Sequence, residues 1–326
     1  MTDIPTAHRR PNAVLDEVDT VIVGKRAATE VVLAGILAGG HVLMEDYPGL
    51  GKTLAARTFA RALGLDFTRA QFTPDLLPSD LTGSFVYDQG RAVFEFRKGP
   101  VFTGLLLADE INRTPPKTQA ALLEAMQEHQ VTVEGQTFML PRPFHVLATA
   151  NPVEYEGTYP LPEAQLDRFL VRVAFGYPGA EDEWEVLGRR MARRREEQEA
   201  RQVVDAAELL ELQATMEDVT VSAEVGRYCV ALTRATRDHE HTLMGASPRG
   251  SLGLLLVGRA YAVLRGRDYV TPDDVKAVAP AVLEHRVVIR PELWMSEVSP
   301  RTVVAELLRS VPTPRTAAAA GTRYTG

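Results

Sequence analysis

The sequence predicts an α/β domain built on a parallel sheet that helices cover, followed by a smaller helical domain. Short apolar runs alternate with stretches of helical periodicity, which is typical of a sheet buried on both faces. A glycine-rich turn joins the first of these runs to a helix expected over residues 53–63. Beyond Tyr177 the strand pattern stops, and helical periodicity continues to Leu308. The runs expected to form strands are 41–45, 67–71, 105–108, 144–150 and 170–175.

The length of 326 residues is enough for a large and a small domain, each with its own core. We expect the α/β domain over residues 13–178 and the helical domain over residues 179–310. The end segments 1–12 and 311–326 carry no apolar periodicity, so both are expected to be flexible.

Two segments inside the α/β domain, 85–96 and 130–140, are expected to form β-hairpins. Both alternate apolar and polar residues, and they turn at Asp88-Gln89-Gly90 and at Glu134-Gly135. Hairpins of this kind are also common decorations without a function of their own.

Charge and composition narrow the possible classes of function. The net charge of −7 argues against a protein that coats nucleic acid, because phosphate contacts need a clustered basic face. The arginine-rich stretch 189–195 is expected to be a solvated helix with internal ion pairs.

Cys229 is the single cysteine and the start of the chain lacks the apolar core of a signal peptide, so we expect a cytoplasmic protein. No membrane span is expected from the longest apolar stretch, 31–37, and the histidines show no spacing that predicts a zinc site.

A phosphate-binding loop is predicted where the first apolar run meets the helix that follows it. The segment DYPGLGKT (46–53) ends in the Gly-Lys-Thr of such loops, although Asp46 stands where the simple motif has a glycine. Glycines let the chain curl, so that backbone N–H groups at the helix start form a positive nest for phosphates. Lys52 is expected to reach the β- and γ-phosphates of ATP, and Thr53 to bind Mg²⁺. The expected nucleotide contacts are Pro48, Gly49, Leu50, Gly51, Lys52, Thr53 and Leu54.

Polar side chains end two further apolar runs. Asp109 and Glu110 follow the run 105–108 in the pattern of a Walker B motif, in which Asp109 holds Mg²⁺ through water and Glu110 polarises the attacking water. An acidic helix cap would look the same, but the phosphate-binding loop upstream favours the catalytic interpretation. Asn151 ends the run 144–150 and suits a sensor of the γ-phosphate, although a strand-ending asparagine is also a common turn former.

These motifs together resemble the MoxR family of AAA+ ATPases from about residue 14 to residue 308. The resemblance implies a P-loop AAA+ domain followed by an all-helical lid, with ATP and Mg²⁺ as ligands. It also implies that Val23 and Gly24 lie near the adenine and that Asn151 is the residue called sensor 1. Arg249 matches sensor 2 on the lid, which acts on its own subunit's ATP or on that of a neighbour. The strings that carry the resemblance are HVL (41–43), PGLGKT (48–53), QFTPDLLPSD (71–80), DEINR (109–113) and QLDRF (165–169).

The resemblance also assigns roles to two other arginines. It implies that Arg168 is the arginine finger, whose charged planar fork stabilises the transferring phosphate in a neighbouring subunit. A surface ion pair of Arg168 with Asp167 or Glu163 is the alternative. Arg113 could reach phosphate across an interface or pair with a carboxylate on the helix that follows Pro115. A finger of this kind requires a head-to-tail neighbour, and repetition of that contact closes a ring, which is a hexamer in this family.

The activity that the resemblance implies is ATP hydrolysis at the subunit interfaces of a homo-oligomeric ring. The ring would remodel, mature or load cofactors onto partner proteins, often ones with a von Willebrand factor A domain. The two hairpins would face the ring centre, but their polar turns lack an aromatic and aliphatic pair, so peptide threading is not expected. The ATPase subunit of a metal chelatase and a non-hydrolysing nucleotide-dependent switch are the alternatives. The acidic balance disfavours helicase or clamp-loading activity.

Overall fold

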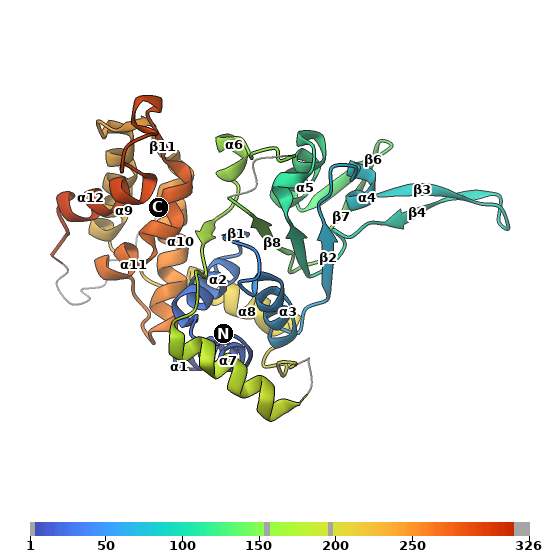
Figure 1. The fold of residues 1–326 in the computed structure, drawn as a ribbon, viewed down its shortest axis with the longest axis horizontal. Coiled ribbons are helices and arrows are strands. Elements are labelled where there is room, and N and C mark those ends of the chain that lie inside the picture. The colour runs from blue at the N-terminus through green and yellow to red at the C-terminus, as the bar shows by residue number, and fades with distance from the viewer. Residues whose placement is uncertain (1–3, 153–156, 195–197, 316–326) are drawn as a thin grey trace.

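The computed structural model describes residues 4–152, 157–194 and 198–315, and it places a parallel sheet beside a group of helices (Figure 1). Neighbouring strands follow the order β2-β5-β8-β1-β9, and every pairing among them is parallel. The predicted parallel sheet is therefore confirmed. Its strands are β1 (Val42–Glu45), β2 (Phe67–Gln71), β5 (Leu105–Asp109), β8 (His145–Ala150) and β9 (Val171–Val173).

Both faces of the sheet are buried, which explains the continuous apolar runs. In β5, Leu105 and Leu107 join one hydrophobic cluster, whereas Leu106 and Ala108 join the other, because successive side chains of a strand point to opposite faces. The carboxyl ends of β1, β8 and β5 meet at one edge, since these parallel strands are neighbours. The helices that contribute to the first cluster are α1 (Ile4–Val21), α2 (Arg26–Leu37) and α3 (Lys52–Ala62), and those of the second are α4 (Pro78–Thr82) and α5 (Pro116–Glu128).

The second part of the chain forms the predicted helical lid. Its helices beyond residue 205 share one hydrophobic cluster with α1, α2 and one face of the sheet, so the separate core that chain length suggested for this part is not observed. A short antiparallel pair, β10 (Thr242–Met244) with β11 (Val288–Ile289), also lies among these helices and is too short for periodicity to reveal. The helices are α7 (Ala180–Arg193), α8 (Ala206–Glu217), α9 (Ala223–Asp238), α10 (Pro248–Leu264), α11 (Pro272–Leu283) and α12 (Pro300–Ser310).

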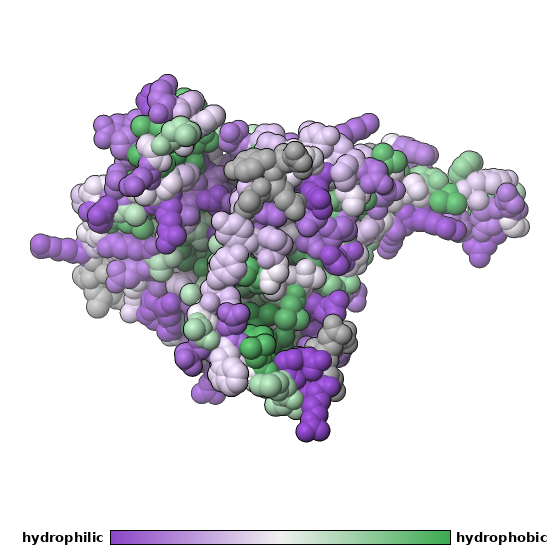
Figure 2. All heavy atoms as spheres, in the orientation of Figure 1, coloured by the Kyte–Doolittle hydropathy of each residue, from purple (hydrophilic) through white to green (hydrophobic). Residues whose placement is uncertain are grey.

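Both predicted hairpins are confirmed, as β3 (Gly83–Asp88) with β4 (Val93–Lys98) and β6 (Gln130–Val133) with β7 (Gln136–Met139). The first projects from the body of the molecule and carries exposed hydrophobic residues (Figures 1 and 2).

The turn of the first hairpin is polar as expected, but an aromatic pair lies just beside it on the strands. Tyr87 and Phe94 pair across the two strands with ring centroids 5.2 Å apart, and they are 48% and 69% exposed. Tyr87 directly precedes the turn on β3, and Phe94 is the second residue of β4. Neither belongs to the turn, so the turn residues alone do not reveal the pair.

The N-terminal segment differs from the expectation of a flexible end. Helix α1 begins at Ile4, and Asn12 Nδ2 donates a hydrogen bond to Leu264 O at 3.0 Å. The Nδ1 atom of His8 lies 2.8 Å from Val263 O. These partners belong to α10, far along the chain, so local periodicity could not predict them. Of the expected C-terminal tail, residues 316–326 lie outside the described residues.

Helix α7 carries the arginine-rich stretch. Arg189 forms an ion pair with Glu185 one turn earlier, which is an internal pair of the expected kind. The helix ends at Arg193, however, and Glu199, which was expected to face the arginines within the helix, lies beyond its end, 4.0 Å from Arg61 of α3. Residues 195–197 lie outside the described part. Across the described residues, every helix is too short or too polar to cross a membrane.

Candidate nucleotide site

The phosphate-binding loop leads from β1 into α3. Gly49 and Gly51 have φ values of +81° and +79°, a left-handed conformation that residues with a Cβ rarely adopt. Gly51 is the N-cap residue of α3, so the free N–H groups of the first helical turn open toward the loop. This geometry suits a phosphate group, because the N-terminus of a helix attracts anions.

A cavity of about 410 Å³, the phosphate cavity, lies at this loop. It brings together most of the predicted site, because the loop follows β1, the carboxylates follow β5 and Asn151 follows β8 between them. Leu50 does not line the cavity within the described residues. The predicted residues in its lining are Pro48, Gly49, Gly51, Lys52, Thr53, Leu54, Asp109, Glu110 and Asn151.

Lys52 is half-buried at this cavity, where its Nζ donates a hydrogen bond to Asp46 O and lies 3.5 Å from Ala150 O. Burial lowers the pKa of Lys52, while the carboxylates of Asp46, Asp109 and Glu110 act in the opposite direction. The ammonium group of Lys52 therefore lies among carbonyl and carboxylate oxygens. A phosphate oxygen can replace one of these carbonyl oxygens as the acceptor of its hydrogen bond.

The aspartate at the first position of the loop has a structural role. Asp46 is buried, its Oδ1 accepts the N–H of Tyr47 at 2.9 Å, and its Oδ2 accepts the N–H of Gly176 at 2.6 Å. A glycine could make neither bond. Asp46 therefore joins the start of the phosphate-binding loop to the residues that lead from β9 to the lid.

Asp109 is held by two partners, neither of which the sequence analysis predicted. Its Oδ1 accepts a hydrogen bond from Thr149 Oγ1 at 2.6 Å, and its Oδ2 accepts two from the Arg69 guanidinium at 2.7 and 2.9 Å. Arg69 lies on β2, the strand next to β5, and lines the phosphate cavity. The sequence signal for Arg69 was the alternation along β2, in which polar residues 69 and 71 flank buried Ala70 and so point to the same face of the strand.

Glu110 stands on a sharp turn at the end of β5. Its φ and ψ of 58° and 50° are left-handed, and its N–H donates to Thr149 Oγ1 at 2.8 Å. The carboxylate accepts hydrogen bonds from Gln71 Nε2 at 2.7 Å and from Arg113 at 3.0 Å. The observed carboxylate partner of Arg113 is Glu110, which precedes the helix at Pro115, whereas the ion pair considered for Arg113 was with a carboxylate on that helix. Gln71 is a further partner of Glu110 that the sequence analysis missed.

The donor set at the phosphate cavity fits Mg²⁺. Thr53 and Asp109 both line it and offer a hydroxyl and a carboxylate, the hard oxygen ligands that Mg²⁺ takes together with water and phosphate. Arg69 supplies the positive charge that neutralises Asp109 in this structure.

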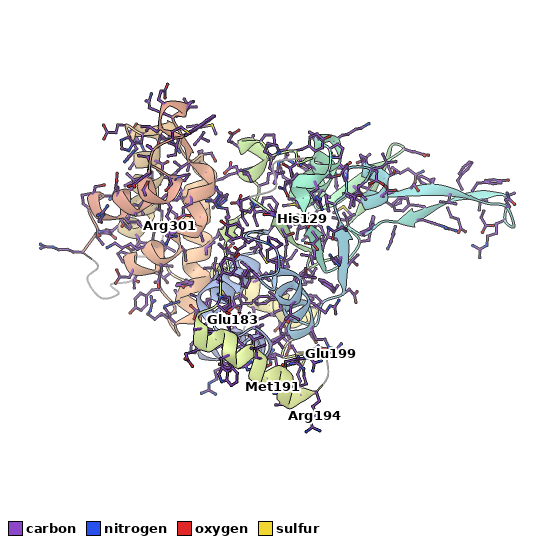
Figure 3. The ribbon with its side chains drawn as sticks, viewed as in Figure 1. His129, Glu183, Met191, Arg194, Glu199 and Arg301 are labelled. Atoms are coloured by element: carbon purple, nitrogen blue, oxygen red, sulfur yellow. The ribbon has the colours of Figure 1, made fainter. Side chains whose placement is uncertain are left out.

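A second cavity of about 500 Å³, the base cavity, lies next to the first, and Leu54 lines both. Val21, Val23 and Val186 form part of its apolar lining. Hydrophobic side chains are visible beside α7 (Figure 2), and Met191 lies near the end of that helix (Figure 3). The rest of the lining is largely polar and includes five arginines, Arg57, Arg61, Arg189, Arg190 and Arg193. A cavity with an apolar side near a phosphate site can take a purine base.

The two residues predicted near the adenine have different surroundings. Val23 lines the base cavity. Gly24 packs against α7 instead, where a Cβ atom would lie 2.2 Å from Asp182 Cγ, and its φ of +68° also favours glycine.

Arg168 and Arg249 lie together but apart from the phosphate cavity. Both line a third cavity of about 260 Å³, the arginine cavity, where the lid meets the end of α6 (Glu163–Leu166) and α5; His129 from this lining is labelled in Figure 3. Among the described residues, the arginine cavity shares no lining residue with the phosphate cavity. The considered ion pair of Arg168 with Asp167 is not observed, because Asp167 pairs with Arg286 at 2.7 Å.

Three side chains of the lid form a group that the sequence analysis did not predict. One ligand atom each of His239, His241 and Glu306 lie within 4.8 Å of one another, and the alternate spacing of the two histidines on extended backbone was the missed signal. The N–H of His241 points at His239 Nδ1 at 3.3 Å, which leaves the proton of a neutral ring on Nε2, 3.2 Å from Glu306 Oε2. This hydrogen bonding occupies the nitrogen that a metal ion would need.

A phosphate-binding loop after β1, paired carboxylates after β5, an asparagine between them after β8 and a helical lid define a P-loop ATPase of the AAA class. Residues 41–171 match the family described as "ATPase family associated with various cellular activities (AAA)", and residues 234–307 match the AAA lid domain.

Individual relatives narrow the class. The chain is 46% identical to "Chaperone MoxR1" of Mycobacterium tuberculosis, over 92% of this chain and 81% of that one. It is 47% identical to the uncharacterised protein YeaC of Bacillus subtilis, over 92% of this chain and 93% of that one. A crystal structure of a candidate ATPase from Cytophaga hutchinsonii superposes with a TM-score of 0.88 and 43% identity, over 95% of this chain and 96% of that one. The chain belongs to the MoxR family of AAA+ ATPases. A magnesium-chelatase 38 kDa subunit of Acidiphilium rubrum is more distant, with 34% identity over 56% of this chain and 53% of that one.

Proposed function

We propose that this chain hydrolyses ATP between the subunits of a head-to-tail ring, in which one subunit supplies the phosphate cavity and its neighbour the arginine cavity. The separation of Arg168 and Arg249 from the phosphate cavity of their own chain carries this proposal. Phosphoryl transfer needs positive charge at the phosphate, and arginines supplied by a second subunit meet that need. A heterologous contact that repeats with a closing rotation gives a ring, here a hexamer.

Within the phosphate cavity, each residue has a role that its position supports. The N–H groups of the loop and Lys52 bind the phosphates, and Thr53 and Asp109 hold Mg²⁺. When bound, Mg²⁺ neutralises charge on the phosphate oxygens. Glu110 orients and polarises the attacking water, and Asn151 reports the γ-phosphate. Gln71 and Arg113 fix the Glu110 carboxylate until the nucleotide is in place.

The site of action of Arg249 follows from its neighbour. Because Arg249 lines the same cavity as Arg168, we assign both to the nucleotide of the adjacent subunit, so that sensor 2 acts in trans. Both arginines then approach the phosphates from one side, opposite Lys52.

The output of hydrolysis is the remodelling, maturation or cofactor loading of partner proteins, including ones with a von Willebrand factor A domain. The name of the MoxR1 relative as a chaperone supports this direction. Exposed Tyr87 and Phe94 on the projecting hairpin add an apolar contact for a client. The chelatase alternative is weaker because that relative matches about half of the chain. A non-hydrolysing switch is disfavoured by the presence of Glu110 in the phosphate cavity.

The steady-state ATPase rate against protein concentration tests the proposal, with Arg168→Ala as the variant and size-exclusion chromatography in ATP alongside. Specific activity should rise with concentration, and the variant should lose about 10³- to 10⁵-fold of turnover while its ADP affinity stays unchanged. A specific activity that is independent of concentration and of Arg168 would contradict the proposal and point to a monomeric ATPase.

A further inference from the structure

A single carboxylate connects the chain segments that carry the two arginines of the arginine cavity. Asp167, which directly precedes Arg168, accepts a hydrogen bond from Arg286 Nε at Oδ1 (2.7 Å) and from Ser247 Oγ at Oδ2 (2.9 Å). Ser247 is also the N-cap residue of α10, and its Oγ accepts the N–H of Arg249 at 3.1 Å. Both oxygens of Asp167 are therefore used, one by each of two lid residues.

Arg286 makes this connection rigid. It lies in the 3₁₀ helix η2 (Glu284–Arg286), its residue is only 6% exposed, and its guanidinium donates to Phe169 O at 2.7 Å and to Leu170 O at 3.2 Å. It also donates to Val282 O within the lid. One guanidinium thus joins the backbone on either side of the lid boundary, and its planar donors fix the orientation as well as the distance.

The Arg286 guanidinium faces one carboxylate, that of Asp167, and also the like charge of Arg249. Burial lowers the pKa of Arg286, the neighbouring Asp167 carboxylate opposes that effect, and Arg249 lowers the pKa further. A buried ion pair of this kind contributes little net stability compared with apolar packing, but removal of one partner leaves an uncompensated charge. The main consequence of the Asp167–Arg286 ion pair is a defined geometry. Arg168, which is half-exposed, and Arg249, which is exposed, would lack such a geometry without it.

We propose that Asp167, Ser247 and Arg286 form a positioning unit that holds Arg168 and Arg249 in one fixed arrangement for the neighbouring subunit's ATP. This inference rests on the proposed hydrolysis between subunits. Asp167 belongs to the α/β domain, whereas Ser247 and Arg286 belong to the lid. The unit therefore ties Arg168 of the α/β domain to Arg249 of the lid, and a rotation of the lid relative to that domain would break these bonds and separate the two arginines.

The test separates this role from simple support of the fold. Asp167→Asn keeps the side-chain shape but removes the charge, so kcat should fall between about tenfold and a hundredfold, while the KM for ATP and the affinity for ADP stay unchanged. Loss of position, not of nucleotide binding, is expected because the phosphate cavity of the variant is intact. An unchanged kcat, or a raised KM with unchanged kcat, would overturn the proposal.

Mixed rings provide a sharper readout. A Glu110→Gln subunit has an intact positioning unit but cannot activate water, so it should supply working arginines to an Asp167→Asn neighbour. The mixture should be more active than the sum of the two variants measured alone. No regain of activity would overturn the proposal, provided that the parallel mixture of Arg168→Ala with Glu110→Gln does regain activity. If both mixtures stay inactive, hydrolysis between subunits is itself wrong, and the positioning role is overturned with it.

Ser247→Ala repeats the test with a milder change, in case Asp167→Asn does not fold. It removes one hydroxyl that both caps α10 and bonds Asp167, so a several-fold lower kcat is expected, again regained in the mixture with Glu110→Gln. Ser222→Ala is the matched control, because Ser222 caps α9 by accepting the N–H of Val225 at 3.3 Å and takes no part in the cluster. Equal losses of kcat in the two serine variants would show a general effect of cap removal and overturn the proposal.

Discussion

Lowering the pH from 7 to 5 should destabilise the fold through two buried histidines at the base of the sheet. His41 Nδ1 accepts the N–H of Val146 at 2.9 Å, and its Nε2 lies 3.1 Å from Met126 O. His145 Nδ1 lies 2.9 Å from Gly40 O. An imidazole that accepts at one nitrogen and donates at the other is neutral, so protonation of His41 breaks its bond to β8.

The size of the effect follows from the pKa values. Burial lowers the pKa of His41 to about 3 and that of His145 to about 4, from the usual 6.5. Below pH 6.5 the unfolded chain therefore binds more protons than the folded chain, so stability falls as the pH falls toward the folded pKa values. A pH of 5 is about 1.5 units below the pKa that each histidine has in the unfolded chain. Protonation of each histidine in the unfolded chain therefore lowers the free energy of unfolding by about 2 kcal/mol, or by about 4 kcal/mol for the two together.

Urea unfolding followed by circular dichroism at pH 7, 6 and 5 measures this loss. His145→Asn will lower the free energy of unfolding at pH 7, but the decrease between pH 7 and 5 should shrink by about 2 kcal/mol, because one titrating group is gone. Each variant is compared with itself across pH, so its lower starting stability does not matter. Equal wild-type stability at pH 7 and 5, or an unchanged pH dependence in the variant, would refute the reasoning.

Three further substitutions test the phosphate cavity. Asp46→Ala leaves two backbone N–H groups without their carboxylate acceptor, so urea unfolding should show a loss of about 2–4 kcal/mol, and an unchanged value would contradict the role given to this residue. Arg69→Gln removes the cation that neutralises Asp109, so titration of Mg²⁺-dependent nucleotide binding should give a several-fold lower half-saturating Mg²⁺ concentration, whereas a higher one would show that Arg69 does not compete. Glu110→Gln should bind ATP like the wild type but lose about 10²- to 10⁴-fold of turnover, and turnover equal to wild type would favour the non-hydrolysing switch.

The sheet and the phosphate cavity could be predicted because their signals are local. Asp109 and Asn151 each follow an apolar run directly, Lys52 follows the glycine-rich turn after another, and parallel strands bring their carboxyl ends to one edge. The phosphate-binding loop needs left-handed glycines, which the sequence displays as Gly49 and Gly51.

The remaining features depend on contacts between distant segments. Asp167 and Arg286 are 119 positions apart, and nothing near either residue indicates the pair. The same holds for Asn12, which fixes the start of α1 to Leu264. Arg69 is an intermediate case, since its alternation on β2 was visible but its partner depended on the strand order.

A mixture of Arg168→Ala and Glu110→Gln subunits tests the central claim, hydrolysis between subunits, most directly. Each variant alone should be nearly inactive, because one lacks the finger and the other the residue that activates water. In a random equimolar ring, about a quarter of the interfaces would combine an intact phosphate cavity with an intact finger. The account therefore predicts that mixing restores about a quarter of the wild-type ATPase rate. A mixture no more active than its two components, under conditions where rings form, would contradict it.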